Sequence, residues 1–108
     1  MSWTVEFANR AAEAEVAALP ADMNARFLHI GDMIRSFGLT SVREPYVKHV
    51  SGKLWEMRLK GRDGIARSIY VAASGQRVVV LRTFTKKTQE TPRREMEIAF
   101  ARMKEMKE

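Results

Sequence analysis

The chain has 108 residues, 45% of them hydrophobic, which predicts one globular domain over residues 1–108 and excludes a disordered chain. Nineteen lysines and arginines against 13 acidic residues give a net charge of +6, which favours a nucleic acid, an anionic surface or an acidic partner. The absence of cysteine excludes disulfides and thiolate metal sites, and is compatible with a reducing cytoplasm. The N-terminal segment contains Glu6 and no long apolar run, so we expect a cytoplasmic protein without a signal peptide or membrane span.

The first third of the chain predicts a short strand followed by two helices. Residues 3–7 alternate between apolar and polar side chains, the pattern of an edge strand. Asn9 is placed to cap an alanine-rich helix that ends before Pro20, and a second helix begins near Asp22 and ends at Gly38. The apolar face of the second helix consists of Phe27, Ile30, Ile34 and Phe37. Because the link is short, the helices form an antiparallel hairpin.

The middle of the chain predicts an antiparallel sheet. We expect residues 40–52 to be irregular and strands to follow at 54–60, 65–73 and 76–84, joined by tight turns. In the first of these strands, one face is core and the other is charged. The core face carries Trp55, Met57 and Leu59, and the charged face carries Glu56, Arg58 and Lys60. With the strand at 3–7, the prediction is an α+β fold in the order β-α-α-β-β-β-α, with about four strands.

The junction between the last strand and the final helix is cationic. Its four cations are Lys86, Lys87, Arg93 and Arg94. Thr91 precedes Pro92, so we expect a helix to begin at about Pro92 with Thr91 as its N-cap. The buried stripe of this helix consists of Met96, Ala99, Phe100 and Met103, and Arg102 points away. The lysine pair favours polyanion binding, and the alternative is a solvated pair without function.

Four charged residues on neighbouring strands form a candidate site. They are Glu56, Arg58, Lys60 and Arg67. Cleavage of RNA without a metal needs a base for the 2′-hydroxyl proton, cations for the phosphate charge, and an acid for the leaving oxygen. Arginine suits the second task, because its planar fork binds phosphate oxygens bidentately and stays charged. The alternative is an ion pair between Glu56 and Arg58 on a solvated sheet face.

Two histidines and two aromatic residues are further candidates. We expect His29, within the second helix, to be structural or solvated. His49 precedes the strand of Glu56 and is flanked by Tyr46, Lys48 and Lys53. It either reaches the charged face or contacts RNA, or it is merely polar surface. Trp55 and Tyr70 are expected to pack in the core. We expect no metal and no cofactor, because the chain has no glycine-rich phosphate loop before a helix, no HExxH motif and no acidic cluster.

Several segments, in order, resemble the HigB-type, phage-related branch of the RelE toxin superfamily. They are residues 53–58 (KLWEMR), 67–70 (RSIY), 84–92 (FTKKTQETP) and the helix from Glu95 to Arg102. The resemblance covers roughly residues 39–104, and residues 84–92 are its most specific part. It implies a RelE-like fold and the activity of a type II toxin, a metal-independent endoribonuclease that enters the ribosomal A site and cuts mRNA.

The resemblance also implies roles for single residues. Arg67 matches the arginine that holds the scissile phosphate, whereas Glu56 and Arg58 stand where RelE has two strand lysines. Glu56 is therefore the candidate base. We expect contacts with RNA or the ribosome from Lys53, Lys60, Lys86, Lys87 and His49. RelE has a tyrosine near the start of its last helix, where this chain has Thr88, Gln89 and Thr91, so no general acid is assigned.

The partners that the resemblance implies are a cognate antitoxin, the ribosome and mRNA, with DNA contacted only through the toxin–antitoxin complex and no membrane. The alternative from the residues themselves is a non-catalytic basic module that binds RNA or protein. A DNA-binding regulator acting alone is disfavoured, because the helical hairpin shows no helix-turn-helix and its second helix exposes few cations.

Overall fold

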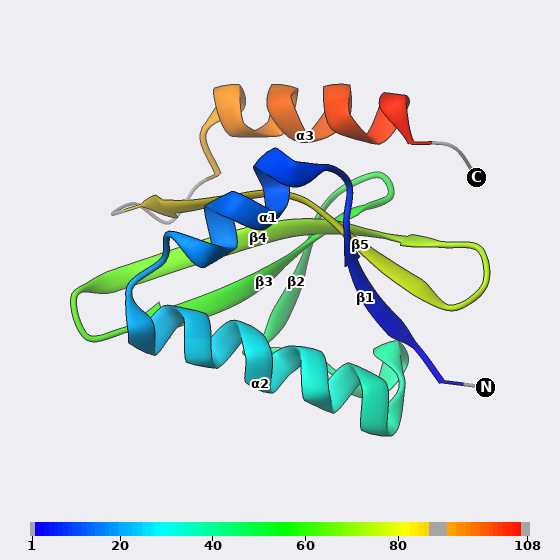
Figure 1. Cartoon of the computed structure of the whole chain (residues 1–108), viewed down its shortest axis with the longest axis horizontal. Coiled ribbons are helices and arrows are strands. Elements are labelled where there is room, and N and C mark those ends of the chain that lie inside the picture. The colour runs from blue at the N-terminus through cyan, green and yellow to red at the C-terminus, as the bar shows by residue number, and fades with distance from the viewer. Residues whose placement is uncertain (1, 87–90, 107–108) are drawn as a thin grey trace.

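The computed structural model describes residues 2–86 and 91–106, and there a five-stranded sheet lies between helices (Figure 1). The strands are β1 (Thr4–Phe7), β2 (Val47–Ser51), β3 (Leu54–Gly61), β4 (Gly64–Ala73) and β5 (Arg77–Lys86). The helices are α1 (Arg10–Ala17), α2 (Ala21–Phe37) and α3 (Arg93–Glu105), with a short 3₁₀ turn, η1 (Leu39–Ser41), after α2. The strand order is β1-β5-β4-β3-β2, with β1 parallel to β5 and the other neighbours antiparallel.

The predicted α+β class and the meander of β3, β4 and β5 are confirmed, but the sheet has five strands rather than about four. The additional strand is β2, in the segment that we expected to be irregular. Val47 is buried and pairs with Met57, so packing against β3 orders a segment in which residues 48 and 49 are both polar. β2 forms one edge of the sheet and β1 forms the other.

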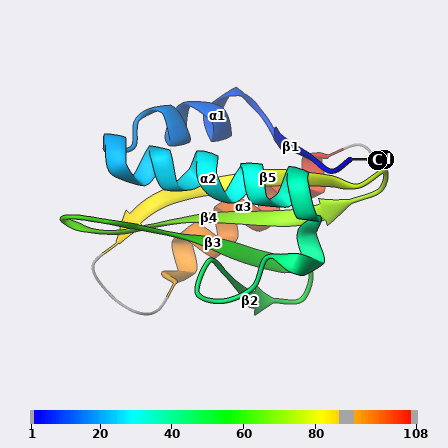
Figure 2. The same ribbon diagram turned by 90° about the horizontal axis from the view of Figure 1, so that it is seen from below.

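Both faces of the sheet are covered by helices, and Figure 2 shows α2 in front of the sheet and α3 behind it. On the α2 face, Phe27 and Ile30 belong to one apolar cluster with Tyr70. On the α3 face, Leu81 and Ala99 belong to a second cluster. The second cluster means that the face carrying Glu56 is not an open, solvated surface, because part of it is core beneath α3.

Three apolar residues expected in the core are exposed, Phe37 mostly and Trp55 and Phe100 by about two fifths. Phe37 is the last residue of α2, and Phe100 lies beside the buried position of Ala99, one residue further round α3. Trp55 lies on the core face of β3, but it lines an open groove past the end of α2. The Asn9 cap is confirmed, since its side-chain oxygen accepts a hydrogen bond of 2.8 Å from the amide of Ala12.

A cluster of charged side chains joins α1, β5 and α3. Glu15 accepts hydrogen bonds from Arg82 at 2.6 Å, from Arg102 at 2.9 Å and from the amide of Thr83 at 3.1 Å. Arg82 also donates to Glu95 at 2.6 Å. The expectation that Arg102 points away is wrong, because it reaches back to Glu15 and to a strand carbonyl. Burial alone would raise the pKa of Glu15, but these donors outweigh it and hold the pKa below its ordinary value.

Within the ranges given above, no helix is long and apolar enough to cross a membrane.

Candidate functional site

The sheet brings Glu56 of β3 and Arg67 of β4 together on the α3 face. In the register, Glu56 faces Ile69, and Arg67 is therefore its diagonal neighbour across the strand pair. The guanidinium of Arg67 donates a hydrogen bond to the carboxylate of Glu56, and both side chains are at least 97% buried. The alternative of a solvated pair between Glu56 and Arg58 is wrong, because Glu56 is buried and bonded to Arg67.

Thr91 connects the start of α3 to this pair. Its hydroxyl donates to the second carboxylate oxygen of Glu56 over 3.2 Å. The expectation that Thr91 caps the helix is wrong, because Pro92 occupies the N-cap position and no side chain bonds the first turn. A hydrogen bond to a charged carboxylate is stronger than one to a neutral amide, which accounts for the choice of partner. The position of α3 and the geometry of the site are therefore linked.

Two further cations follow on the same face of β3. Arg58 lies directly opposite Arg67 in the register and is half-buried, whereas Lys60 is exposed near the end of the strand. Two arginines facing each other repel, and the ion pair of Arg67 with Glu56 offsets that repulsion. Arg58, Arg67 and Glu56 together carry a net charge of +1, which suits the binding of a phosphate.

The exposed Arg93 and Arg94 stand in the first turn of α3, one and two residues beyond Pro92. They add two cations at the start of α3, close in sequence to Thr91, whose hydroxyl bonds Glu56. Both were assigned to the cationic junction from the sequence. Lys86 ends β5, and its side chain lies outside the described part of the structure, as do Lys87, Thr88 and Gln89.

His49 and Lys53 are not brought to Glu56. His49 pairs with Trp55, and residues opposite each other in a register share a face, so His49 lies on the face away from Glu56. Its Nε2 donates to the carbonyl of Gly52 at 2.8 Å, and its ring meets the Trp55 ring at 70° with centroids 5.1 Å apart. His29 is exposed, and its ring makes an edge contact with Tyr46. The predicted set is thus divided between the two faces of the sheet.

The described residues contain no group of three or more histidine, aspartate or glutamate side chains placed to hold a metal ion. The site that they do form consists of charged side chains, with Tyr70 on the opposite face in the core as predicted.

The residues that sequence reasoning missed are the partners that fix α3 over the sheet, chiefly Glu15 and Arg82. They lie 67 residues apart in the chain, so no local pattern indicates that they meet. One signal was present, since Arg82 follows the wholly apolar run of residues 78–81 within the same strand. A charged residue at such a position is expected to have a partner.

Comparison with known proteins places the fold in a family. The family model described as phage derived protein Gp49-like (DUF891) matches residues 14–104. The archaeal RelE in the crystal structure of the RelE–RelB complex from Pyrococcus horikoshii is similar, with 20% identity, a TM-score of 0.62, and coverage of 83% of this chain and 100% of that chain. A double arginine-to-alanine mutant of E. coli toxin RelE in the free state has 14% identity, a TM-score of 0.65, and coverage of 95% of this chain and 99% of that chain. No curated protein sequence matches. The chain therefore belongs to the phage-derived Gp49-like family, and its fold is that of the RelE toxins.

Proposed function

We propose that this protein is the toxin of a type II toxin–antitoxin module and cuts mRNA on the ribosome, as its resemblance to the HigB-type branch implies. Support comes from the likeness of its fold to RelE toxins, one of them in a complex with RelB, and from its net charge of +6. The observation that carries the proposal is the placement of Arg67, Arg58 and Glu56 together on one sheet face beneath the start of α3.

In this proposal the site divides the chemistry among three side chains. Arg67 and Arg58 bind the oxygens of the scissile phosphate and stabilise the charge that grows on them. Glu56 accepts the proton of the 2′-hydroxyl, whose oxygen then forms a bond to phosphorus as the bond to the 5′-oxygen breaks. The departing oxygen takes a proton from a group that these residues do not supply, and the ribosome aligns the strand.

The closed arrangement sets a condition for this chemistry. Because Glu56 and Arg67 are buried and bonded to each other, their ion pair must open before a phosphate reaches the arginine, and Thr91 must leave Glu56 before the carboxylate meets the 2′-hydroxyl. Lys60, exposed on the same face, and the Arg93 and Arg94 pair of α3 are placed to attract the phosphates on either side.

The proposal includes two further predicted RNA contacts, Lys86 and Lys87. Replacing both by glutamine is expected to weaken association with RNA or ribosomes and to make that association less dependent on salt, since fewer counterions are released. An unchanged salt slope would return the pair to a solvated role. Lys60→Gln, at another predicted RNA contact, is expected to lower the salt dependence in the same way, and Lys53 and His49 are considered separately below.

The partners in this proposal follow from the same assignment. A cognate antitoxin neutralises the protein, and DNA is bound only by the toxin–antitoxin complex. The toxin and the antitoxin both act in the cytoplasm, where the translating ribosomes are. The RelE of Pyrococcus horikoshii in a complex with RelB supports an antitoxin partner. A small open reading frame for a DNA-binding protein beside this gene is the expected genetic arrangement.

The second candidate is a non-catalytic basic module of the same fold that binds RNA or protein. One observation favours it: Glu56 and Arg67 satisfy each other in a buried ion pair, as two structural residues would. In that case the pair fixes the position of β3 against β4, and cations such as Lys60 and Arg93 bind a partner without cleavage.

Primer extension on mRNA from cells that express the protein separates the two candidates. Cuts within translated codons are expected for the toxin, together with growth arrest that disappears on Arg67→Ala. Arg35→Ala is a matched control, because Arg35 is an exposed arginine of α2 outside the site, and it should leave the cuts unchanged. Circular dichroism must show each variant to be folded. A folded Arg67→Ala protein that still cuts mRNA would refute the assignment.

A further inference from the structure

A groove of about 700 Å³ opens on the sheet face opposite the Glu56 site. Its floor is formed by Trp55 of β3 and Tyr70 of β4, which lie opposite each other in the register. Val42, just after η1, and Val47, the first residue of β2, form a wall. The groove exists because α2 ends at Phe37, whereas the apolar face of the sheet continues beyond it. This volume lies within the range of sites that hold a small organic molecule.

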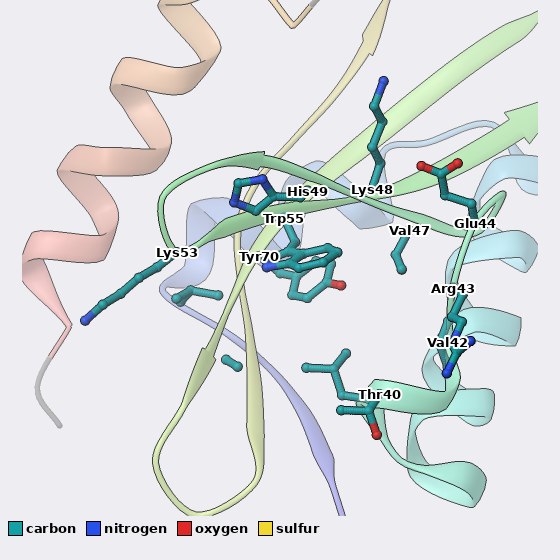
Figure 3. Close-up of a pocket in the computed structure, with 13 residues that line it drawn as sticks. Thr40, Val42, Arg43, Glu44, Val47, Lys48, His49, Lys53, Trp55 and Tyr70 are labelled. Atoms are coloured by element: carbon teal, nitrogen blue, oxygen red, sulfur yellow. The ribbon is translucent and has the colours of Figure 1, made fainter.

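One polar group is buried in this groove and points into it. Tyr70 is only 2% exposed, yet Figure 3 shows its hydroxyl directed into the space between the floor and the wall. No residue within the described ranges forms a hydrogen bond with that hydroxyl. Burial raises the pKa of Tyr70 above its ordinary value, so the hydroxyl keeps its proton and remains a donor. A donor that opens onto the groove and has no partner among the described residues is available to an acceptor atom of a ligand.

The aromatic side chains of the groove provide a stacking surface. Trp55 is 40% exposed, although it lies on the core face of the sheet. The His49 ring packs against it in an edge contact, with its own orientation fixed by the hydrogen bond to the Gly52 carbonyl. An open indole ring supported from one side is the surface on which the bases of single-stranded RNA stack.

Cations stand around the rim. Arg43, Lys48 and Lys53 line the groove, against the single acid Glu44. None of the three cations has an ion-pair partner among residues 2–86 and 91–106. In Figure 3 the Lys53 side chain extends outward from the rim, where it would meet a group attached to a ligand, whereas the Lys48 side chain points away from the groove, toward the sheet face of its register partner Glu56. An apolar aromatic floor with a cationic rim suits a flat base bearing a phosphate.

From these observations we propose that the groove binds one nucleotide of single-stranded RNA, with its base stacked on Trp55, an acceptor atom of the base bonded to the Tyr70 hydroxyl, and its phosphate at Lys53. Lys48, on the Glu56 face of β2, would meet the neighbouring phosphate of the same strand. The proposal rests on the proposed function only in taking RNA as the source of the nucleotide. It gives the predicted RNA contacts His49 and Lys53 a location distinct from the Glu56 site.

The two sites are related through the edge of the sheet. Glu56 and Trp55 are neighbours in β3, so their side chains point to opposite faces. Only β2 separates β3 from the sheet edge, and Lys48 of β2 pairs with Glu56 while His49 pairs with Trp55. A strand of RNA that passes around β2 therefore contacts both faces. The groove would hold a base that flanks the one at Glu56 and Arg67.

The test uses Trp55 as its own probe. The chain has two tryptophans, so Trp3→Phe leaves Trp55 as the single source of indole emission. Adenosine and uridine 5′-monophosphates are titrated into this protein, with adenosine and ribose 5-phosphate as the ligands that lack phosphate or base. Saturable quenching by a nucleotide is expected, with weaker binding of adenosine and weakest binding of ribose 5-phosphate. A single-stranded tetranucleotide is expected to bind more tightly than either mononucleotide, which distinguishes an RNA strand from a free nucleotide.

Variants locate the binding. Tyr70→Phe and Lys53→Gln are each expected to raise the nucleotide dissociation constant about fivefold, whereas Lys48→Gln should weaken binding of the tetranucleotide and leave that of the mononucleotides unchanged. Lys104→Gln removes an exposed cation of α3, and Phe37→Ala removes an exposed aromatic ring of α2, so neither should change binding. Circular dichroism of Tyr70→Phe checks that its effect is not a loss of folding.

Three results would overturn the proposal. They are the absence of saturable quenching, binding of ribose 5-phosphate as tight as that of the nucleotides, and a Trp55 emission change caused by the antitoxin but by no nucleotide. The last result would assign the groove to a protein partner. Nucleotide binding without mRNA cuts in primer extension would leave the groove as proposed and refute the nuclease, whereas cuts without nucleotide binding would do the reverse.

Discussion

The guanidinium of Arg67 and the carboxylate of Glu56 form an ion pair between neighbouring strands, and the protein buries both side chains almost completely. Removing one partner of such a pair leaves a buried charge and typically costs about 3–5 kcal/mol, whereas removing both charges costs much less than the sum. This relationship makes the stability and the proposed activity of the site depend on the same two residues.

A double-mutant cycle on this pair is therefore informative. We expect Arg67→Met and Glu56→Gln each to lower the free energy of unfolding, with the double variant losing at least about 1 kcal/mol less than the sum. Urea denaturation of the four proteins measures the coupling. Additive losses would show that the ion pair contributes nothing beyond the two side chains. The double variant is also a useful control for growth arrest, because it removes the charges without leaving one unpaired.

Thr91 gives a test of how α3 is fixed to the sheet. Thr91→Val keeps the shape of the side chain and removes the hydroxyl that donates to Glu56, so we expect a loss of about 1–2 kcal/mol of stability. Thr91→Ser keeps the hydroxyl and should lose less. Equal losses for the two variants would mean that packing of the methyl group, rather than the hydrogen bond, holds the segment.

Glu15 predicts a pH dependence. Its folded-state pKa lies below the ordinary value of 4.5, so its ionised form stabilises the fold above that pH, and this stabilisation is lost as the pH falls through the folded-state pKa. We expect Glu15→Gln to destabilise the protein by about 2 kcal/mol at pH 7 and by less below about pH 4. Denaturation curves at several pH values measure the difference.

Glu13→Gln is the control for that experiment, because Glu13 is an exposed carboxylate of the same helix. It should change stability little at either pH. A difference between wild type and Glu15→Gln that stays constant from pH 7 to pH 3 would contradict the role given to the Glu15, Arg82 and Arg102 contacts.

Two glycines predict opposite effects of the same substitution. A Cβ at Gly61 would lie 2.8 Å from Oδ2 of Asp22 and 2.8 Å from the side chain of Met23, and that Asp22 oxygen accepts the amide of Arg62 at 2.6 Å. Gly61→Ala is therefore expected to cost about 1–3 kcal/mol. Gly31 lies inside α2, where the nearest atom would be 3.5 Å away in the flexible side chain of Arg35.

Because alanine favours a helix over glycine, Gly31→Ala is expected to stabilise the protein by about 0.5–1 kcal/mol. Thermal denaturation of both variants checks the pair. A stabilising Gly61→Ala would show that the turn after β3 moves away from α2 at little cost, and a destabilising Gly31→Ala would show that this part of α2 is packed more closely than the distances indicate.

Local sequence determined the elements whose signals lie within a few residues of one another. Asn9 before an alanine-rich run, the spacing of Phe27, Ile30 and Ile34, and the alternation in residues 54–60 are of this kind. The α+β class and the three-stranded meander followed from them and are confirmed. Segment 47–51 was missed, because its pairing with β3 supplies the order that its own pattern does not.

The sequence also brought Glu56, Arg58 and Arg67 into one candidate group, since alternation fixes which side chains of a strand share a face. It did not determine which charges pair, what covers them, or that Thr91 bonds Glu56 instead of capping α3. Those outcomes depend on register and on the placement of α3 by residues up to 87 positions apart in the chain. Periodicity specifies directions along one element, whereas burial and pairing arise only when separate elements pack together.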